Sequence, residues 1–571
     1  MSNIRNFAII AHIDHGKSTL ADRFLEIANV VQPGKHEEQL LDRNPISRER
    51  GITIKLAPVQ LTYRGHELNL IDTPGHVDFS YEVDRTLSCV EGVILLVDAT
   101  KGIQAQTISN AYKAIEKGLL IIPVINKIDL PHADVDKTKK QMVDFLGVKE
   151  DEIREISAKT GKNIEELLEF ITQQIPPPKT YSSSEIQALI FDSYYDPHRG
   201  VIAFIRVFQG NLEKGAKLEL ASSGQTFETL EVGFFSPDLK PKEKLSEGDV
   251  GYLITNLKDI HAVRVGDTMR AKGSRVPYVP GYKKAQSMVY ASIFTTDTND
   301  YLNLKKALEK LYLNDSSLEF TGIYSKALGA GFRVGFLGLL HADVVRERLE
   351  REYDLHLVLT PPQVEYKKAD KQGQILEPYV KLLLVTPSEH MPDVMRLCED
   401  HRGIFITMDN KNQITLTYEM PLSEMISDFF DQLKSVSSGY ASLDWEFLEY
   451  RSVSADKLSI LLNGEPVDEF SEVVVVERAF QTGSQLVKRL KDLIPRQQYE
   501  VKIQAHYKGK IIASERLSPF RKDVTQKLYG GDRTRKDKLL KKQKAGKKKM
   551  KMVGRVEIPK EAFLKLFRRD Q

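Results

Sequence analysis

Five short motifs in the first 160 residues combine residue types that suit the binding of a nucleoside triphosphate. They are residues 11–19 (AHIDHGKST), 48–54 (RERGITI), 72–76 (DTPGH), 126–129 (NKID) and 157–159 (SAK). Any one of them could arise by chance, because each specifies only a few positions. All five in this order predict a single nucleotide-binding site, whose loops the fold must bring together.

The first motif predicts a phosphate-binding loop between a strand and a helix. Residues 6–11 (NFAIIA) are typical of a buried strand, and residues 18–28 have helical periodicity. A loop that enters a helix N-terminus directs backbone N–H groups at an anion. We therefore expect Lys17 to add charge for the β- and γ-phosphates and the Ser18 hydroxyl to bind Mg²⁺. The usual G-x-x-x-x-G-K-[ST] pattern is broken at Ala11, so this motif alone leaves a plain Gly-Lys-Ser turn as an alternative.

The third motif carries the candidate hydrolytic residues. It follows the apolar run at residues 66–71, which places Asp72 at the carboxyl end of a predicted strand. A carboxylate there can hold Mg²⁺ through the water ligands of the metal. Gly75 leaves room for a backbone N–H beside the γ-phosphate, and His76 is the candidate for orienting the attacking water. Taken alone, His76 would be interpreted as a surface loop histidine, but its position after DTPG favours the catalytic interpretation.

The last two motifs suit a guanine base. Residues 93–97 (VILLV) and 120–125 (LIIPVI) are apolar runs separated by helical segments, which indicates a parallel sheet. Asn126 and Asp129 follow the second run, and the Asp129 carboxylate can accept from the N1–H and 2-amino groups that only guanine carries. Adenine would leave this carboxylate without donors. The residues predicted to bind GTP are Asp14, His15, Gly16, Lys17, Ser18, Thr19, Gly75, Asn126, Lys127, Ile128, Asp129, Ser157, Ala158 and Lys159.

The motifs AHIDHGKST, RERGITI and DTPGHVDF together resemble the translational GTPases, the group that contains elongation factors Tu and G. The resemblance implies that the Thr53 hydroxyl reaches Mg²⁺ in the GTP state and that Asp14 lies beside the phosphates. Ile13 and Ile52 would form an apolar gate around His76. Loops ordered by the γ-phosphate and Mg²⁺ would be released on hydrolysis. The ribosome, rather than an arginine finger, would place His76, so intrinsic hydrolysis should be slow.

The composition indicates a large soluble protein of several domains. The chain has 571 residues, 41% of them hydrophobic and 28% charged, whereas one domain usually has about 100–200 residues. No apolar run approaches the ~18 residues of a membrane-spanning helix. The only cysteines are Cys89 and Cys398, which are far apart in sequence. This spacing argues against a disulfide framework or a zinc site and favours a reducing cytosol.

The predicted fold class is a multidomain combination of α/β, β and α+β units. A Pro- and Ser-rich linker (IPPPKTYSSS) follows the nucleotide motifs, and short alternating apolar runs with glycine turns then predict a barrel. Two later segments repeat a strand–helix rhythm typical of ferredoxin-like domains, although this rhythm is also common in unrelated folds. The predicted domains are a P-loop GTPase domain (1–180), a β-barrel (186–276), two ferredoxin-like α+β domains (285–368 and 376–480) and a basic α+β C-terminal domain (481–571).

Two runs in the α+β segments resemble elongation factor G. Residues 331–341 (GFRVGFLGLLH) and 421–425 (PLSEM) look like parts of its third and fifth domains. Only about ten residues separate the end of one segment near Tyr366 from the start of the next near Glu377. The fourth domain, which enters the decoding site in elongation factor G, has no room between them. We therefore do not expect an ordinary forward translocase.

Residues 531–571 carry sixteen Lys or Arg and five Asp or Glu, a net charge of +11, whereas the whole chain is only +3. This density predicts a salt-sensitive contact with RNA phosphates, and the scarcity of aromatics favours backbone contact over base stacking. A solvated tail or a contact with anionic lipid stays an alternative, but the apolar residues 556–567 favour an ordered RNA contact. The predicted RNA-binding residues are Arg533, Arg535, Lys536, Lys538, Lys541, Lys542, Lys544, Lys547, Lys548, Lys549 and Lys551.

Residues 5–23, 492–500 (DLIPRQQYE) and 529–551 (YGGDRTRKDKLLKKQKAGKKKMK) resemble the elongation factor 4 (LepA) family, and the resemblance covers essentially the whole chain. It implies a ribosome-dependent GTPase that uses GTP/GDP and Mg²⁺ and promotes back-translocation of tRNAs on mispositioned or stalled ribosomes. Such a protein would support the fidelity and efficiency of translation under stress. The implied partners are the ribosome, with its rRNA and ribosomal proteins, and tRNA. The implied location is the bacterial cytoplasm.

Other interpretations stay open. A ribosome-associated stress GTPase of BipA type shares this architecture, although the tail sequence argues against it. A membrane-associated signalling switch could use the basic tail on an anionic cytoplasmic membrane surface, and a peripheral membrane position is an alternative location in any case. An RNA-binding assembly factor could use GTP only structurally, and its function would then survive His76→Ala. We expect a monomer, because no coiled-coil heptad is apparent.

Overall fold

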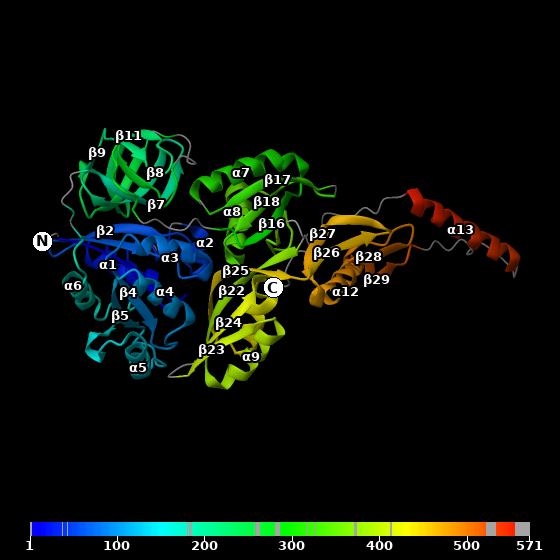
Figure 1. Cartoon of the computed structure of the whole chain (residues 1–571), viewed down its shortest axis with the longest axis horizontal. Coiled ribbons are helices and arrows are strands. Elements are labelled where there is room, and N and C mark those ends of the chain that lie inside the picture. Colours follow the sequence, from blue (N-terminus) through cyan, green and yellow to red (C-terminus); the bar gives the residue numbers. More distant parts are fainter. Residues whose placement is uncertain are drawn as a thin grey trace.

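The computed structural model of the protein describes residues 3–553 except residues 37, 43, 180, 182–184, 256, 258–262, 280–285, 316, 326, 370–373, 411–413 and 521–532, and it leaves out the side chains of residues 369, 535 and 545–553. Figure 1 shows a β-rich domain beside the N-terminal domain, the two α+β domains beside each other in the middle, and the C-terminal domain beyond them. The N-terminal domain and the β-rich domain lie at one side, and helix α13 (Arg533–Val553) lies at the opposite end. In this part of the chain, no helix is long and apolar enough to cross a membrane.

The N-terminal domain is built on a six-stranded sheet in the order β2-β3-β1-β4-β5-β6. Neighbouring strands are parallel except β2 and β3. Alternate residues of β1 point into two separate hydrophobic cores, which is typical of a parallel sheet with helices on both faces. The strands are β1 (Ile4–Ala11), β2 (Ala57–Tyr63), β3 (His66–Asp72), β4 (Gly92–Asp98), β5 (Leu120–Asn126) and β6 (Arg154–Glu155). The helices are α1 (Lys17–Ile27), α2 (Pro45–Arg50), η1 (Val77–Phe79), α3 (Ser80–Leu87), α4 (Ala105–Glu116), α5 (Val135–Leu146), η2 (Glu150–Glu152) and α6 (Ile164–Gln174).

The second domain is a closed antiparallel β-barrel. Its strands follow the order β10-β15-β7-β8-β14-β11-β12, and β10 also pairs with β11, which closes the sheet on itself. The barrel strands are β7 (Gln187–Asp196), β8 (Gly200–Gln209), β10 (Lys217–Leu220), β11 (Thr226–Ser236), β12 (Asp238–Lys242), β14 (Val250–Thr255) and β15 (Thr268–Ala271). Two short strands, β9 (Leu212–Glu213) and β13 (Lys244–Leu245), form a separate pair.

Two α+β domains follow, each with an antiparallel sheet and helices packed on it. In the first, β16 lies between β18 and the short strands β19 and β20. Its elements are β16 (Val289–Thr295), η4 (Thr298–Asp300), α7 (Tyr301–Asn314), β17 (Glu319–Ser325), β18 (Gly329–Phe336), α8 (Leu339–Tyr353), β19 (Leu357–Leu359) and β20 (Gln363–Val364). The second contains β21 (Lys367–Ala369), β22 (Gln374–Thr386), η5 (Ser388–His390), α9 (Met391–Asp400), β23 (Ile404–Asn410), β24 (Ile414–Pro421), α10 (Leu422–Glu424), the π-helix η6 (Met425–Phe429), α11 (Phe430–Val436) and β25 (Ser442–Val453).

The C-terminal domain has a four-stranded sheet in the order β27-β26-β28-β29, with α12 against it. The α/β, β and α+β parts of the predicted fold class are thus confirmed. The C-terminal sheet, however, begins before the predicted boundary at residues 480 and 481, because β26 pairs with β28 far along the chain. The other predicted domain limits stay predictions. The elements are β26 (Ala455–Leu462), β27 (Glu465–Val475), α12 (Val476–Leu493), β28 (Val501–Tyr507), β29 (Lys510–Leu517) and α13.

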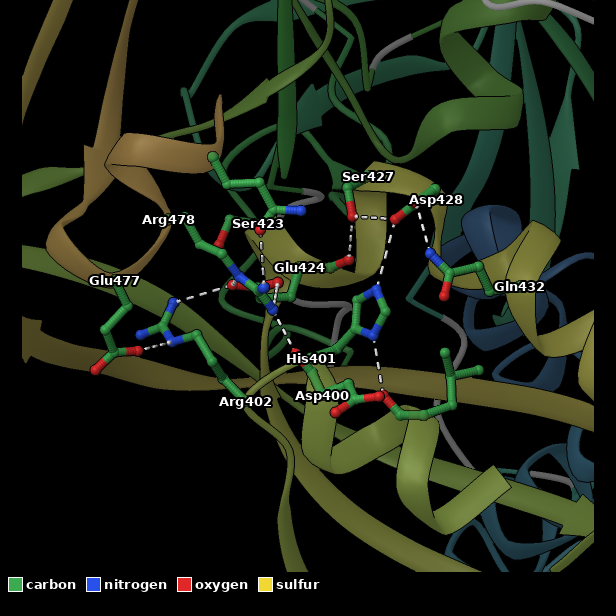
Figure 2. Close-up of polar contacts among 12 residues, drawn as sticks. Asp400, His401, Arg402, Ser423, Glu424, Ser427, Asp428, Gln432, Glu477 and Arg478 are labelled. Carbon is green, nitrogen blue, oxygen red and sulfur yellow. Dashed lines mark hydrogen bonds and ion pairs between the residues drawn. The ribbon is translucent and has the colours of Figure 1, made fainter. Parts of the chain in front are cut away.

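A cluster of charged side chains joins the second α+β domain to the C-terminal domain (Figure 2). Arg402, which follows α9, lies 2.9 Å from the buried Glu377 and 3.6 Å from both Glu424 and Glu477. Arg478, in the first turn of α12, donates to the two carboxylate oxygens of Glu424 at 3.1 and 3.0 Å. The two arginines therefore hold the start of α12 against the preceding domain. We call this set of side chains the Arg402 cluster.

Candidate nucleotide-binding site

The predicted phosphate loop lies between β1 and α1, at the carboxyl edge of the parallel sheet. Gly16 is the N-cap of α1 with φ of 92°, and a Cβ there would lie 2.4 Å from Asn126 Nδ2. Only glycine fits this position without strain. The Asn126 amide donates to the His15 carbonyl at 2.9 Å, and Lys127 Nζ donates to the Asp14 carbonyl at 2.5 Å. The loop is thus held from the end of β5.

Four predicted residues from three segments of the chain meet at the first turn of α1. Lys17 Nζ donates to Asp72 Oδ1 at 2.7 Å and to Thr53 Oγ1 at 2.6 Å. Ser18 Oγ lies 3.3 Å from Thr53 Oγ1. Lys17, Thr53 and Asp72 are all buried, so the contact between the ammonium and the carboxylate is poorly screened by solvent. The fold thereby connects the phosphate loop to the RERGITI and DTPGH segments, while Thr19 lies half-buried in the same turn of α1.

The sequence analysis missed a second carboxylate at this point. Thr53 Oγ1 donates to Asp42 Oδ2 at 3.3 Å, and Asp42 is buried. Burial, together with the nearby charge of Asp72, raises the pKa of Asp42. No motif contains Asp42, because its position depends on how the segment between α1 and α2 folds back. Two hydroxyls and two carboxylates thus form one network through Thr53 Oγ1, beside the Lys17 ammonium. Oxygen donors of this kind suit Mg²⁺.

The DTPGH segment passes close to the phosphate loop. A Cβ on Gly75 would lie 3.2 Å from the Ala11 carbonyl oxygen, so a larger residue would push the two segments apart. His76 is the N-cap of η1, and its Nδ1 accepts from the Asp78 backbone N–H at 3.1 Å. When the ring is neutral, its proton is therefore on Nε2. Ile13 and Ile52 are both half-buried, and their role as a gate stays a prediction.

The first motif contains two histidines, His12 and His15, whose rings pack edge-to-face with centroids 5.3 Å apart. The His15 ring is fully buried, with Nδ1 3.3 Å from the Leu96 carbonyl oxygen and 3.2 Å from the Asp98 backbone N. The pKa of His15 is lowered to about 3, mainly by burial and next by the charge of the neighbouring His12. The pKa of His12 is lowered to about 4, mainly by burial and next by the charge of Lys101. Both rings are uncharged at neutral pH, so neither brings a positive charge to the phosphates.

The predicted base-binding residues come from the ends of β5 and β6. Asn126 Oδ1 accepts from the Ala158 N–H at 2.9 Å while its Nδ2 holds the phosphate loop, so Asn126 ties the two loops together. Ser157 Oγ donates to Asp129 Oδ1 at 2.6 Å and accepts from the Thr160 N–H at 3.2 Å. The exposed Asp129 carboxylate therefore has one oxygen held by the protein. The backbone N–H of Ile128 is fixed by the Ile156 carbonyl at 3.4 Å.

Four family models match separate parts of the chain, in chain order. The elongation factor Tu GTP-binding domain matches residues 2–177, elongation factor Tu domain 2 residues 200–270, the elongation factor G C-terminus residues 374–461, and the GTP-binding protein LepA C-terminus residues 462–568. Curated relatives called elongation factor 4 are similar over the whole length. Those from Desulfitobacterium hafniense and Aquifex aeolicus are each 48% identical over 99% of both chains, and one from a Hydrogenobaculum species is 48% identical over 100% of both.

The chain belongs to the elongation factor 4 family. As a member of the elongation factor 4 family with the elongation factor Tu type of GTP-binding domain, the protein is a GTPase that binds guanine nucleotides. A crystal structure of a protein from Thermus thermophilus superposes with a TM-score of 0.59 at 16% identity, covering 79% of this chain and 97% of that one. This likeness shows a shared fold. The predicted family and its enzyme activity are thus confirmed.

Arg23 is a further residue of the nucleotide-binding site that the motifs did not reveal. From α1 it donates to the carbonyl oxygens of Ala158 and Lys159 at 2.9 and 3.2 Å, and it is paired with Glu26 on the same helix. Its guanidinium therefore fixes the loop expected to close over the base. The only hint in the sequence was its place on the helix that follows the phosphate loop.

Replacing Arg23 with alanine should loosen the 157–159 loop. We expect the affinity for GDP to fall about three- to tenfold, because the loss of charge-assisted hydrogen bonds to main-chain oxygens costs about 1 kcal/mol. Titration with a fluorescent GDP analogue would measure this change. Arg64→Ala is the matched control, since Arg64 forms exposed pairs with Glu165 and Glu169 and should leave the affinity unaltered. Equal affinity in the two variants would contradict the role of Arg23.

The predicted RNA-binding tail of this elongation factor 4 homologue forms helix α13, which extends away from the other domains (Figure 1). The predicted residues whose side chains are described are all exposed, namely Arg533, Lys536, Lys538, Lys541, Lys542 and Lys544. The side chains of Arg535, Lys547, Lys548, Lys549 and Lys551 lie outside the described residues, as does the whole of segment 556–567. Contact of this helix with RNA stays a prediction.

Proposed function

We propose that the protein is a ribosome-dependent GTPase that binds ribosomes in its GTP state and promotes the backward movement of mispositioned tRNAs, supporting accurate and efficient translation under stress. The observation that supports a conformational switch controlled by the nucleotide is the contact of Thr53 with Lys17 at 2.6 Å. It connects the segment after α2 directly to the phosphate loop. A phosphate that draws Lys17 toward itself must therefore change the surroundings of Thr53. Such a change is how a γ-phosphate controls the order of a switch segment.

The oxygen donors gathered around Thr53, beside Lys17, fit a bound Mg²⁺. Ser18 and Thr53 would hold it through their hydroxyls, and Asp72 and Asp42 through its water ligands. The ion would neutralise the charge on the β- and γ-phosphates. In the described part of the chain, no group of three His, Cys, Asp or Glu side chains could hold a metal. The protein would thus supply mainly hydroxyl and water-mediated contacts, as is usual for Mg²⁺ beside a nucleotide.

In the proposed reaction, each predicted residue acts on a different part of the nucleotide. The Lys17 ammonium and the loop N–H groups bind the phosphates, and Asp129 accepts from the guanine edge. His76 donates from Nε2–H to the attacking water and orients it, since its Nδ1 already accepts from Asp78. A neutral ring protonated at Nε2 can orient water but cannot take a proton from it at that atom. Asp14 would lie beside the phosphates, and Ile13 and Ile52 would limit access to the ring.

The ribosome and tRNA are the proposed partners. Exposed lysines along α13 form a surface that suits nucleic-acid phosphates. The printed name of the relatives, elongation factor 4, and the match to domains of elongation factors Tu and G support a ribosomal role. The proposed location is the bacterial cytoplasm, and the proposed state is a monomer. An association of α13 with the cytoplasmic face of the cell membrane is the alternative, and flotation with anionic liposomes in the presence and absence of ribosomes would separate the two.

The first test is GTP hydrolysis by the purified protein, alone and with intact ribosomes, across a salt series. We expect ribosomes to raise the rate strongly and the stimulation to fade as salt rises, because counterion release weakens phosphate contacts. His76→Ala should lower the stimulated rate by about 10²-fold, a typical loss when a reacting group is no longer held in position. Absence of stimulation at every salt concentration would contradict the ribosomal role. Unchanged hydrolysis by His76→Ala would favour a structural role for GTP.

The direction of tRNA movement needs its own measurement. Ribosomes in the post-translocation state would be mixed with the protein and GTP, and the position of the mRNA would be followed by primer extension. A backward shift of the mRNA by one codon is the expected result. No shift, or a forward shift, would contradict back-translocation while leaving ribosome-dependent hydrolysis intact, and a BipA-type role would then be favoured.

A further inference from the structure

The position of the His76 ring depends on the backbone of Asp78. The His76 Nδ1 accepts from the Asp78 N–H at 3.1 Å, and Asp78 Oδ1 lies 3.7 Å from the same ring nitrogen. The Asp78 side chain is only 5% exposed, whereas that of His76 is 21% exposed. The ring can therefore reach a ligand while the residue that orients it is enclosed. Any movement of Asp78 will rotate or shift the ring.

The carboxylate of Asp78 leaves the N-terminal domain and binds the first α+β domain. Its Oδ2 accepts from the backbone N–H of Leu340 at 2.8 Å and from that of His341 at 3.3 Å. These groups belong to the first turn of α8, whose own N-cap residue, Gly338, provides no side-chain acceptor. A negative charge at a helix N-terminus is stabilised by the unpaired N–H groups and the helix dipole. Asp78 thus caps a helix of another domain.

Gly338 makes this approach possible. A Cβ at Gly338 would lie 2.2 Å from the Asp78 carboxyl carbon and from Oδ1. The backbone of Gly338 is extended, so alanine would be tolerated by the local conformation, and the three nearest atoms that its Cβ would meet all belong to the Asp78 carboxyl group. The position therefore offers a way to displace Asp78 without altering the N-terminal domain.

The capped end of α8 is itself fixed. His341 Nε2 bonds Asp315 Oδ2 at 2.8 Å, and His341 Nδ1 accepts from the Leu337 N–H at 3.0 Å. The Phe79 ring packs edge-to-face on the His341 ring, with centroids 6.1 Å apart. The first turn of α8 is thus held on both sides, and it provides a firm support for the His76 segment.

Helix α8 also contacts the other switch segment. Arg50 of α2 pairs with Glu347 at 2.7 Å, and Glu49 of α2 pairs with Arg351 at 2.7 Å. Lys55, two residues after Thr53, donates to the Asn314 carbonyl at the end of α7 at 2.9 Å. The first α+β domain therefore contacts the segments on both sides of the proposed γ-phosphate position.

We propose that Asp78 is a positioning residue, which fixes His76 for hydrolysis by anchoring its loop to the N-terminus of α8. The first α+β domain must then be seated on the N-terminal domain for the ring to be in place. This inference rests on the proposed role of His76. If the contact served stability alone, its loss would lower the melting temperature but would leave the rate of hydrolysis by the folded protein unchanged.

The test compares variants on both sides of the contact in ribosome-stimulated, single-turnover GTP hydrolysis. Asp78→Ala and Gly338→Ala should each lower the maximal rate about tenfold or more, because a misplacement of about 1 Å is enough for such a loss. Asp78→Asn retains an oxygen that accepts from the Leu340 N–H, so it should stay within about threefold of the wild type. The dissociation constant for a fluorescent GTP analogue should be unchanged in all three. Asp343→Ala is the control, since it removes an exposed carboxylate of α8 whose pair is Arg346 on the same helix.

The outcomes separate this inference from the proposed function. A wild-type rate for Asp78→Ala, with a slow His76→Ala variant, would overturn the inference alone. A wild-type rate for His76→Ala would remove the proposed role of that ring and the inference with it. A slow Asp78→Ala together with a normal Gly338→Ala would also overturn it, because the carboxylate would then act without α8. The result we expect is a lower hydrolysis rate in both Asp78→Ala and Gly338→Ala, with unchanged affinity for the nucleotide.

Discussion

Asp129→Asn is expected to lower the affinity for GTP by about 10³-fold and to create affinity for xanthosine triphosphate. The carboxylate would accept from the N1–H and 2-amino groups of guanine, and an asparagine N–H₂ would face those donors with a donor of its own. A site that must bury unpaired polar groups discriminates by several orders of magnitude. Xanthine carries a carbonyl oxygen at C2, which can accept from the asparagine amide. The specificity should therefore switch rather than merely weaken.

Ser157 should strengthen the expected change of specificity from GTP to xanthosine triphosphate. Its Oγ donates to Asp129 Oδ1 at 2.6 Å, and it is kept in place by the Thr160 N–H at 3.2 Å. In the asparagine variant the carbonyl oxygen would keep this bond, which would orient the amide nitrogen toward the base. Ser157→Ala in the Asp129→Asn background should therefore reduce the affinity for xanthosine triphosphate again.

Competition of GTP, xanthosine triphosphate and ATP for a fluorescent nucleotide would measure the switch. Asp134→Asn is the matched control, because Asp134 caps α5 by accepting from the Lys137 N–H at 3.0 Å and an asparagine caps equally well. It should bind GTP like the wild type. Tight GTP binding by Asp129→Asn would show that Asp129 does not recognise the base.

The core of the nucleotide site could be predicted because local motifs sit at the ends of parallel strands. The carboxyl ends of β1, β3 and β5 meet at one edge of the sheet, so Lys17, Asp72 and Asn126 had to lie close together once the strand order was known. Thr53 was placed there only by resemblance to the family, since it follows no strand. In the structure Thr53 accepts a hydrogen bond from Lys17, a contact that was not predicted, while its role toward a metal stays a prediction.

Other features depend on contacts that no local pattern encodes. Asp42 reaches Thr53 because the segment between α1 and α2 folds back, and Asp78 meets Leu340 because two domains dock. The predicted boundary at residues 480 and 481 failed for the same reason. The strands before it pair with strands after it, Ile460 with Ala505 for example. Alternation of apolar residues indicates a strand but does not say which sheet it joins.

A second large effect is expected from Glu377→Ala, which should lower local stability by about 3–5 kcal/mol, the usual loss when one partner of a buried ion pair is removed. The Glu377 side chain is fully buried and accepts from Arg402 through both oxygens, at 3.3 and 2.9 Å. Ser423 and the Tyr366 hydroxyl add bonds at 2.6 and 3.2 Å. Removal of the Glu377 carboxylate would leave the largely buried Arg402 guanidinium without its closest carboxylate.

Because the protein has several domains, hydrogen exchange followed by mass spectrometry is a better measurement than a single melting temperature. Amides of β22 and β24 should lose protection, while those of β1 and β4 in the N-terminal domain should not. Glu477→Ala is the matched control within the Arg402 cluster. Glu477 lies 3.6 Å from the same guanidinium, but its side chain is 76% exposed, so its loss should cost less than about 1 kcal/mol.

The loss should also spread to the C-terminal domain. Arg402 lies 3.6 Å from Glu424, and Glu424 is bound by Arg478 in the first turn of α12. Without Glu377, the Arg402 guanidinium can move toward Glu424 and compete with Arg478 for it, which weakens the attachment of α12. The first turn of α12 should therefore exchange faster in Glu377→Ala, and Arg478→Ala should do the same while leaving β22 protected. If β22 and the first turn of α12 in Glu377→Ala kept the wild-type protection from hydrogen exchange, the Arg402 cluster would not hold the two domains together.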